Sequence, residues 1–143
     1  AHVPRALHPR VEEVGVAMDV RATTKYLQIS PQKLRLVCDV VRGMEPYAAL
    51  DRLKFMPHKG ARMVAKTLKS AIANAENNFE LDVSEMVIGQ IYANDGPRRP
   101  WRRFGARGRF KPWIRRTSHL TVVLSEREAQ AEAEPRGARE MEE

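Results

Sequence analysis

The stretch from Pro97 to His119 restricts the structures open to this chain more than any other. It holds nine Lys or Arg and no Asp or Glu, and both tryptophans of the chain and two of its four phenylalanines fall within it. Proline and glycine interrupt these residues, so the apolar positions follow neither a helical nor a strand period. Nine like charges would repel one another in an isolated protein. We therefore predict a loop that contacts nucleic acid, in preference to an ordinary solvated surface.

Composition narrows the class of protein further. A chain of 143 residues fits one domain with tails, and its net charge of +7 again favours a polyanionic partner. Cys38 is the only cysteine, which rules out an internal disulfide and a cysteine-rich zinc site. No apolar run approaches the roughly 18 residues that cross a bilayer. We expect an intracellular protein without membrane contact, located in the cytoplasm or in an organelle.

Hydrophobic periodicity predicts one strand, three helices and a second strand before the basic stretch, and a third strand after it. Strands are expected over residues 21–29, 86–94 and 118–125, and helices over residues 31–42, 46–56 and 61–77. Ser30-Pro31 is a typical helix start, with the serine side chain as N-cap acceptor and the proline in the first turn. The last strand alternates, so we expect one strongly apolar face and one mixed face.

Each predicted helix has an apolar stripe that can pack on a sheet. The stripes are Leu34, Val37, Cys38 and Val41 in the first helix, Tyr47, Leu50 and either Leu53 or Lys54 in the second, and Val64, Thr67, Leu68, Ala71, Ile72 and Ala75 in the third. The small and aliphatic residues of the third stripe suit a helix that lies on a sheet.

The basic stretch lies between two of the predicted strands. Residues 95–117 number 23, too many for a tight hairpin, and they are too polar for a packed insertion. If the flanking strands are antiparallel and continue outward, arms of about nine residues at roughly 3.3 Å each extend about 30 Å from the domain. An isolated two-stranded ribbon is marginal in water, so we expect the tip to become ordered on its partner.

The residue types in this stretch suit RNA. Arginine binds phosphate through paired hydrogen bonds and stacks on bases, and aromatic rings offer further stacking surfaces. The candidate contacts are Arg98, Arg99, Trp101, Arg102, Arg103, Arg107, Arg109, Lys111, Trp113, Arg115 and Arg116. An alternative for the two tryptophans is that they fold back onto the domain.

A second group of basic residues surrounds the start of the first predicted helix: Arg21, Lys25, Lys33 and Arg35. A helix N-terminus offers free amides and a favourable dipole to phosphate, so we expect a phosphate contact here, with a solvated face as the alternative. Lys59 and Arg62, at the start of the third helix, form a weaker example of the same pattern.

The sequence offers no active site or cofactor site. Ser118 and His119 are neighbours on a predicted strand and point to opposite faces, so they form a poor nucleophile and base pair. His2, His8 and His58 lack metal-ligand spacing, and no phosphate-loop or dinucleotide-binding glycine motif is present. We therefore expect no enzyme, no metal, no cofactor and no small-molecule substrate.

A helix-turn-helix DNA-binding module is the alternative function. The second helix, the Pro57-His58-Lys59-Gly60 turn and the third helix have that order. Against it, the polar face of the third helix has few base-reading groups, and the strongest charge lies in the 97–119 stretch.

Three motifs share their order and spacing with a known family. The first is SPQKLRLV from Ser30 with Val41-Arg42-Gly43, the second is SAIANAENN from Ser70, and the third is RRTSHLTVV from Arg115. Together they resemble the large-subunit ribosomal protein L twenty-two family of bacterial type, over residues 21–126. The resemblance implies an α+β fold: three helices packed on a small three-stranded antiparallel sheet, with a long projecting β-hairpin over residues 95–118.

The resemblance also implies a function. It indicates a structural constituent of the large ribosomal subunit that binds large-subunit ribosomal RNA, supports assembly and lines the nascent-peptide exit tunnel with its hairpin. The implied partners are this RNA, neighbouring large-subunit proteins and the nascent peptide. The implied RNA contacts are Lys33, Arg35, Asn74, Arg115, Arg116, Ser118 and His119, and the implied tunnel-lining tip is Phe104, Gly105, Ala106, Arg107, Gly108 and Arg109.

This chain departs from the family pattern within the hairpin. Members have a Met-Lys-Arg-like segment after the Gly-Pro pair and Pro-Arg-Ala before the tip, where this chain has Arg98 to Arg103 and Phe104-Gly105-Ala106. The hairpin length is unchanged, so we expect its reach to be unchanged. Outside the resemblance, residues 1–20 are predicted to be a flexible arm and residues 127–143 an acidic disordered tail.

Overall fold

The structure, a computed structural model, describes residues 18–127. Most of the predicted arm and all but the first residue of the predicted tail lie outside this range. In chain order the elements are β1 (Val20–Leu27), α1 (Pro31–Val41), α2 (Pro46–Lys54), α3 (Lys59–Asn78), the 3-10 turn η1 (Val83–Glu85), β2 (Met86–Asp95), β3 (Arg99–Phe104), the 3-10 turn η2 (Ala106–Gly108), β4 (Phe110–Arg115) and β5 (Ser118–Glu126). The predicted α+β fold is confirmed, and element ends differ from the predicted ones by at most two residues.

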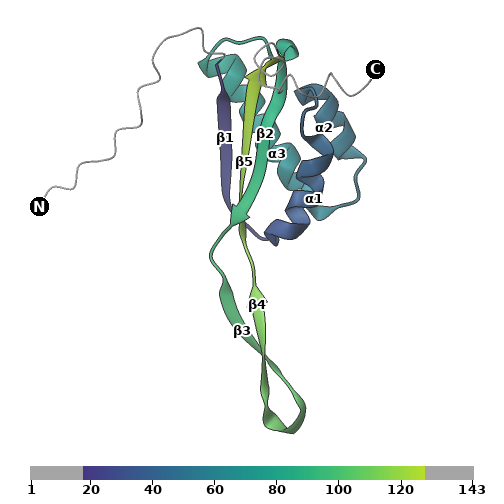
Figure 1. Cartoon of the computed structure of the whole chain (residues 1–143), viewed down its shortest axis with the longest axis vertical. Coiled ribbons are helices and arrows are strands. Elements are labelled where there is room, and N and C mark those ends of the chain that lie inside the picture. The colour runs from purple at the N-terminus through teal and green to yellow at the C-terminus, as the bar shows by residue number, and fades with distance from the viewer. Residues whose placement is uncertain (1–17, 128–143) are drawn as a thin grey trace, which may run out of the picture.

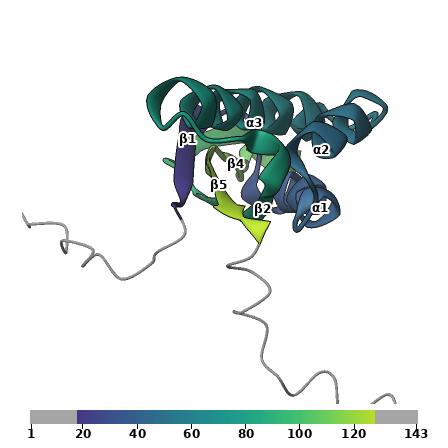
Figure 2. The same ribbon diagram turned by 90° about the horizontal axis from the view of Figure 1, so that it is seen from above.

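The domain has two layers, a three-stranded antiparallel sheet and the helices that cover one of its faces (Figures 1 and 2). The strand order is β1-β5-β2, so the last strand of the chain is the central one. β3 and β4 form a separate two-stranded ribbon that projects away from the domain (Figure 1). Within residues 18–127, no helix is both long and apolar enough to cross a membrane.

The core lies between the sheet and the helices. Leu120, Val122 and Leu124 on β5 are fully buried, and the register places Ala22 beside Val122 and Ile88 beside Leu124. A register shift between Ile88 and Gln90 adds a bulge to β2, which returns later residues of that strand to the helix side. The apolar stripes predicted for the first and third helices are all buried, Cys38 included.

The second face of β5 is more buried than its alternation predicts. Thr121 and Val123 are less than a tenth exposed, although both point away from the helices. Arg21 on β1 and Gln90 on β2 lie on either side of Val123 in the sheet, and side chains of adjacent strands shield one another. The central position of β5 therefore explains why both of its faces are buried. The alternation of apolar residues in the sequence does not show whether a strand is central or at an edge.

Two predictions about helix starts and faces were wrong. Ser30 is the N-cap residue of α1, but its side chain makes no capping hydrogen bond. Tyr47 does not join the buried stripe of α2; its side chain is exposed and its hydroxyl donates to the Glu76 carboxylate over 2.7 Å. Leu53 is buried as that stripe predicts, whereas Pro46 and Ala49 are buried in place of Tyr47.

The first prediction concerns the core of α3. Leu68 is fully buried, so Leu68→Ala removes packing and leaves a cavity, with an expected loss of about 2–5 kcal/mol in the free energy of unfolding. Urea denaturation measures this loss. Ser70→Ala, on the exposed side of the same helix, is the control and should change stability by less than about 0.5 kcal/mol. Equal effects of the two substitutions would contradict the packing described for α3.

Candidate nucleic-acid interface

The register of the ribbon gives it two chemically different faces. Arg99 pairs with Arg115, Trp101 with Trp113 and Phe104 with Phe110, and side chains alternate between faces along each strand. The cationic–indole face carries Arg99, Trp101, Arg103, Lys111, Trp113 and Arg115. The apolar face carries Pro100, Arg102, Phe104, Phe110, Pro112 and Ile114. All twelve side chains are exposed.

The cationic–indole face is held together by its own contacts. The two indole rings meet edge to face with centroids 6.3 Å apart. The Arg103 guanidinium carbon lies 4.2 Å from the Trp113 centroid, and that of Arg115 lies 5.2 Å from Trp101 and 5.1 Å from Trp113. Both tryptophans are exposed on the ribbon and contact each other, so neither packs into the core of the domain, although Trp113 also lines a groove beside the domain. Trp101 is still 49% exposed, which leaves ring surface for a base.

The apolar face ends in an aromatic pair beside the tip. The rings of Phe104 and Phe110 have centroids 5.4 Å apart, and Phe104 is 89% exposed. Arg102 is the only cation on this face, with its guanidinium carbon 5.8 Å from the Phe110 centroid. The two faces of the ribbon therefore present different chemistry to whatever surrounds it.

The tip is a short turn with two residues in left-handed conformations. Arg107 and Gly108 have φ of 58° and 71°, and the Gly105 amide donates to the Arg109 carbonyl over 2.7 Å. A Cβ at position 105 would lie 2.8 Å from that same carbonyl oxygen, so the turn requires glycine there. Arg107 and Arg109 are both exposed.

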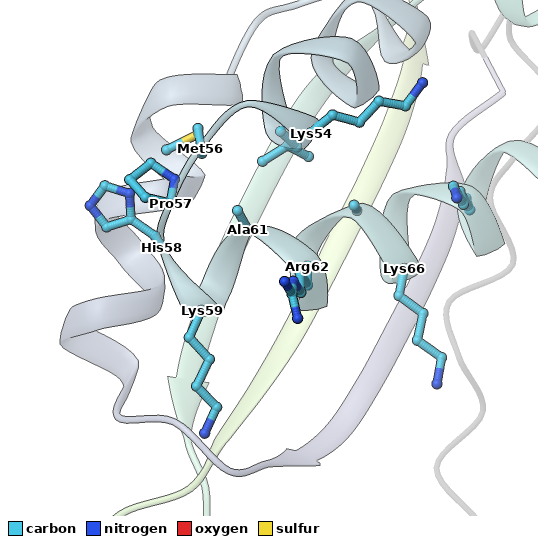
Figure 3. Close-up of a pocket in the computed structure, with 11 residues that line it drawn as sticks. Lys54, Met56, Pro57, His58, Lys59, Ala61, Arg62 and Lys66 are labelled. Carbon is cyan, nitrogen blue, oxygen red and sulfur yellow. The ribbon is translucent and has the colours of Figure 1, made fainter.

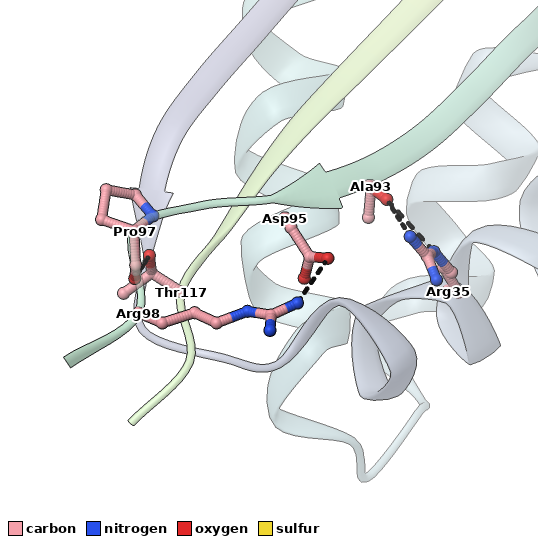
Figure 4. Close-up of polar contacts among 6 residues, drawn as sticks. All are labelled: Arg35, Ala93, Asp95, Pro97, Arg98 and Thr117. Carbon is pink, nitrogen blue, oxygen red and sulfur yellow. Dashed lines mark hydrogen bonds and ion pairs between the residues drawn. The ribbon is translucent and has the colours of Figure 1, made fainter. Parts of the chain in front are cut away.

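The neck between the sheet and the ribbon consists of Gly96, Pro97 and Thr117. Figure 4 shows Pro97 and Thr117 side by side. The Gly96 amide donates to the Thr117 carbonyl over 2.8 Å, and the Thr117 hydroxyl donates to the Pro97 carbonyl over 2.7 Å. A Cβ on Gly96 would lie 2.4 Å from that hydroxyl oxygen. Because strand pairing is interrupted here, each arm of the ribbon is a six-residue strand, and the predicted continuous arms of about nine residues are wrong.

Beside the neck, a basic groove of about 430 Å³ joins segments that are distant in sequence. Lys33 of α1, Lys59 of α3, and Trp113, Arg115 and Arg116 of the return arm line it together with the loop that precedes α1. The predicted contacts Lys33, Arg115 and Arg116 are therefore neighbours in space. Lys59, which had only weak support from sequence, completes this base groove.

Two other predicted RNA contacts hold the edges of the sheet. Arg35 donates from Nε and from one terminal nitrogen to the Ala93 carbonyl, over 3.1 and 3.0 Å (Figure 4). Asn74 donates to the Arg21 carbonyl over 3.4 Å. β2 and β1 are the edge strands, so these side chains satisfy carbonyls that lack a strand partner. Arg35 and Asn74 thus have intramolecular partners.

Ser118 and His119 point to different partners, as their positions on a strand predict. The Ser118 hydroxyl is fully buried and donates to the Ile29 carbonyl over 3.0 Å. The Nδ1 atom of His119 accepts the Tyr26 amide over 3.0 Å, and the two rings meet edge to face. Both residues therefore brace β5 against β1 and the loop after it, and Ser118 has no exposed surface for RNA.

The second predicted basic group does not form one patch. Arg21 lies on the sheet face opposite the helices, whereas Lys33 is in the base groove and the Arg35 side chain, from α1, is bonded to the edge of β2. Lys25 is exposed near the end of β1. In the hairpin, Arg98 forms a salt bridge with Asp95 over 3.2 Å (Figure 4). The first arginine of the basic stretch is therefore paired with a carboxylate that lies just before the stretch.

Sequence reasoning missed the neck residue Thr117 and the exposed cations farther along α3. The pairing of Thr117 with Pro97 spans 20 positions, and no local pattern reports it. Lys66 and Lys69 lie on the exposed side of α3, and helical periodicity alone does not distinguish a binding surface from an ordinary solvated face. Among residues 18–127, no group of three His, Cys, Asp or Glu is placed to hold a metal ion.

The comparisons with known proteins all match one protein family. The sequence model of the family described as Ribosomal protein L22p/L17e matches residues 22–125. The Large ribosomal subunit protein uL22 of Caldicellulosiruptor saccharolyticus is 52% identical over 107 residues, which cover 75% of this chain and 88% of the relative. The uL22 proteins of Clostridium novyi and Chloroflexus aggregans are 47% and 50% identical over 110 and 112 residues, covering 77% of this chain in each case and 99% and 97% of the relatives.

The second prediction tests the neck. Thr117→Val removes the hydroxyl and its hydrogen bond to the Pro97 carbonyl, so we expect a loss of about 0.5–1.5 kcal/mol in the free energy of unfolding. Thr117→Ser keeps the hydroxyl and is the matched control. Denaturant unfolding of the two variants measures the difference, and equal stability would show that the Thr117 hydroxyl does not hold the neck.

Proposed function

The chain belongs to the family of the large ribosomal subunit protein uL22, and on this premise we propose that it binds large-subunit ribosomal RNA through its hairpin and the base groove. It is a structural protein of the large subunit, part of a ribonucleoprotein that carries out translation, and not an enzyme. The observation that carries the proposal is the cationic–indole face, an exposed surface that combines four cations with two tryptophans.

The chemistry of this face suits folded RNA. Its guanidinium groups can pair with phosphate oxygens, and its indole rings can stack on unpaired bases. The base groove extends the same charge onto the domain, since Lys33 and Lys59 lie beside the return arm. RNA segments bound at the two places are bridged by one rigid protein, which is how the chain supports assembly of the subunit.

The tip is proposed to form part of the nascent-peptide exit tunnel. Residues 104–109 lie at the far end of the ribbon from the domain, and the ribbon is two strands wide, about 5 Å between strand axes. Such a slender element can pass between RNA segments that would exclude a helix pair. Neighbouring large-subunit proteins are proposed to contact the exposed surfaces of the domain.

The third prediction concerns salt dependence. Arg103→Gln/Arg115→Gln removes two charges from the cationic–indole face, so the log-log slope of RNA affinity against salt should become shallower by about two. Titration of the full chain with a fragment of large-subunit RNA measures the slope. Arg52→Gln/Arg127→Gln, at exposed positions on α2 and after β5, removes the same net charge and is the control.

Two outcomes would contradict RNA binding by the hairpin. One is an equal change of the salt slope in both double variants, because the change would then depend only on the net charge of the protein and not on the hairpin. The other is binding of duplex DNA with the same affinity as structured RNA, which would favour the helix-turn-helix alternative.

The fourth prediction tests the position of the tip. Burial raises the pKa of the Cys38 thiol to about 11, so this thiol stays protonated and unreactive near neutral pH. Ala106→Cys then adds the one accessible thiol of this chain. In assembled ribosomes treated with a thiol oxidant, it should form a disulfide with a cysteine placed in a stalled nascent peptide. Ala48→Cys, exposed on α2, is the control and should give no such crosslink. Equal crosslinking from both positions would contradict a tip in the tunnel wall.

A further inference from the structure

A second basic groove lies between the end of α2 and the first half of α3 (Figure 3). Its volume is about 710 Å³, larger than that of the base groove, and its lining includes Lys54, Lys59, Arg62, Lys66 and Lys69. Figure 3 shows Lys59, Arg62 and Lys66 extending from one side of α3, while Lys54 extends the other way along α2. We call this cavity the α2–α3 groove.

The geometry of α3 explains why these cations gather. Arg62, Lys66 and Lys69 are at positions i, i+4 and i+7, which fall on one side of an α-helix. At 1.5 Å per residue they extend over about 10 Å along the helix axis. The opposite side of α3 is committed to the sheet through Val64, Leu68 and Ala71. Packing of the apolar stripe therefore fixes a row of three cations toward solvent.

The lining contains cations and no carboxylate. Lys54 forms a salt bridge with Asp51 over 3.3 Å. Within residues 18–127, none of the α3 cations forms a salt bridge. The start of α3 lies in the same groove, and the His58 side chain makes no capping hydrogen bond there, so the first amides of the helix add positive potential. This surface attracts anions.

The lining also contains no Trp, Tyr or Phe. Single-stranded nucleic acid is usually held on aromatic stacking surfaces, which the hairpin has and this groove lacks. Double-stranded RNA is recognised mainly through its phosphates and its shape. The chemistry of the α2–α3 groove therefore matches the backbone of an RNA duplex.

The α2–α3 groove adjoins the base groove, because Lys59 lines both. The Lys59 amine donates to the Gln28 carbonyl over 3.1 Å, which fixes it at the boundary between the two. We infer that the α2–α3 groove is a separate site for duplex RNA, which it grips by phosphate contacts from Arg62, Lys66 and Lys69. The inference rests on the proposed function for the class of partner, and it adds a second site with a different RNA structure.

The experiment uses the full chain and two RNA probes. The first is a duplex of about 16 base pairs, the length over which a double-stranded RNA-binding domain makes its contacts, and the second is an unpaired strand of equal length. Arg62→Gln/Lys66→Gln should make the salt slope for the duplex shallower by about two and leave the unpaired strand almost unaffected. Arg103→Gln/Arg115→Gln should do the reverse. Arg52→Gln/Arg127→Gln again controls for net charge.

Charge-preserving changes separate binding from folding. Arg62→Lys/Lys66→Arg should bind the duplex like the unaltered chain, and thermal unfolding of every variant should stay within a few degrees because these side chains are exposed. A duplex slope that is unchanged in Arg62→Gln/Lys66→Gln would overturn the groove while leaving hairpin binding in place. The inference would also be overturned if Arg62→Gln/Lys66→Gln kept its RNA affinity but lost an acidic neighbouring protein from the subunit. If the unaltered chain bound neither RNA probe, the proposed function would be contradicted as well.

Discussion

The pairing of β5 with both β1 and β2 is the constraint on which the rest of the structure depends. β5 is central, its helix-facing residues Leu120, Val122 and Leu124 are fully buried, and a slip of one residue would turn them away from the helices. The same register places Gly96 against Thr117 at the point where the chain leaves the sheet. The direction of the hairpin is thus a consequence of how the core packs.

Arginine has two separate functions in this fold. Arg35 and Arg42 donate to the Ala93 and Ile91 carbonyls on the free edge of β2, where no strand supplies an amide. Pairing the edge in this way blocks addition of a strand from another chain. The ribbon arginines instead lie over indole rings and remain exposed. A mutation to lysine would be tolerated differently in the two settings, because only the guanidinium forms two bonds to one carbonyl.

Sequence patterns predicted the features that depend only on residues close together in the chain, such as helices and their buried faces. The buried stripe of Leu34, Val37, Cys38 and Val41 follows from helical spacing alone. The roles of Arg35 and Ser118 do not, because their acceptors lie 58 and 89 positions away. The same limit explains the candidate site: its charge and aromatic content were visible in the sequence, whereas the two faces of the ribbon required the register of β3 against β4.

The ribbon shows how a segment with so many like charges can keep its shape before a partner arrives. Each Arg–indole contact contributes about 0.5–1 kcal/mol at an exposed site, and the Trp101–Trp113 pair adds a contact between the arms. These contacts fix guanidinium groups in place, which lowers the entropy lost when they later bind phosphate. They do not neutralise any charge, however. The repulsion among the cations is relieved by an anion, so the proposed RNA partner would stabilise the ribbon further.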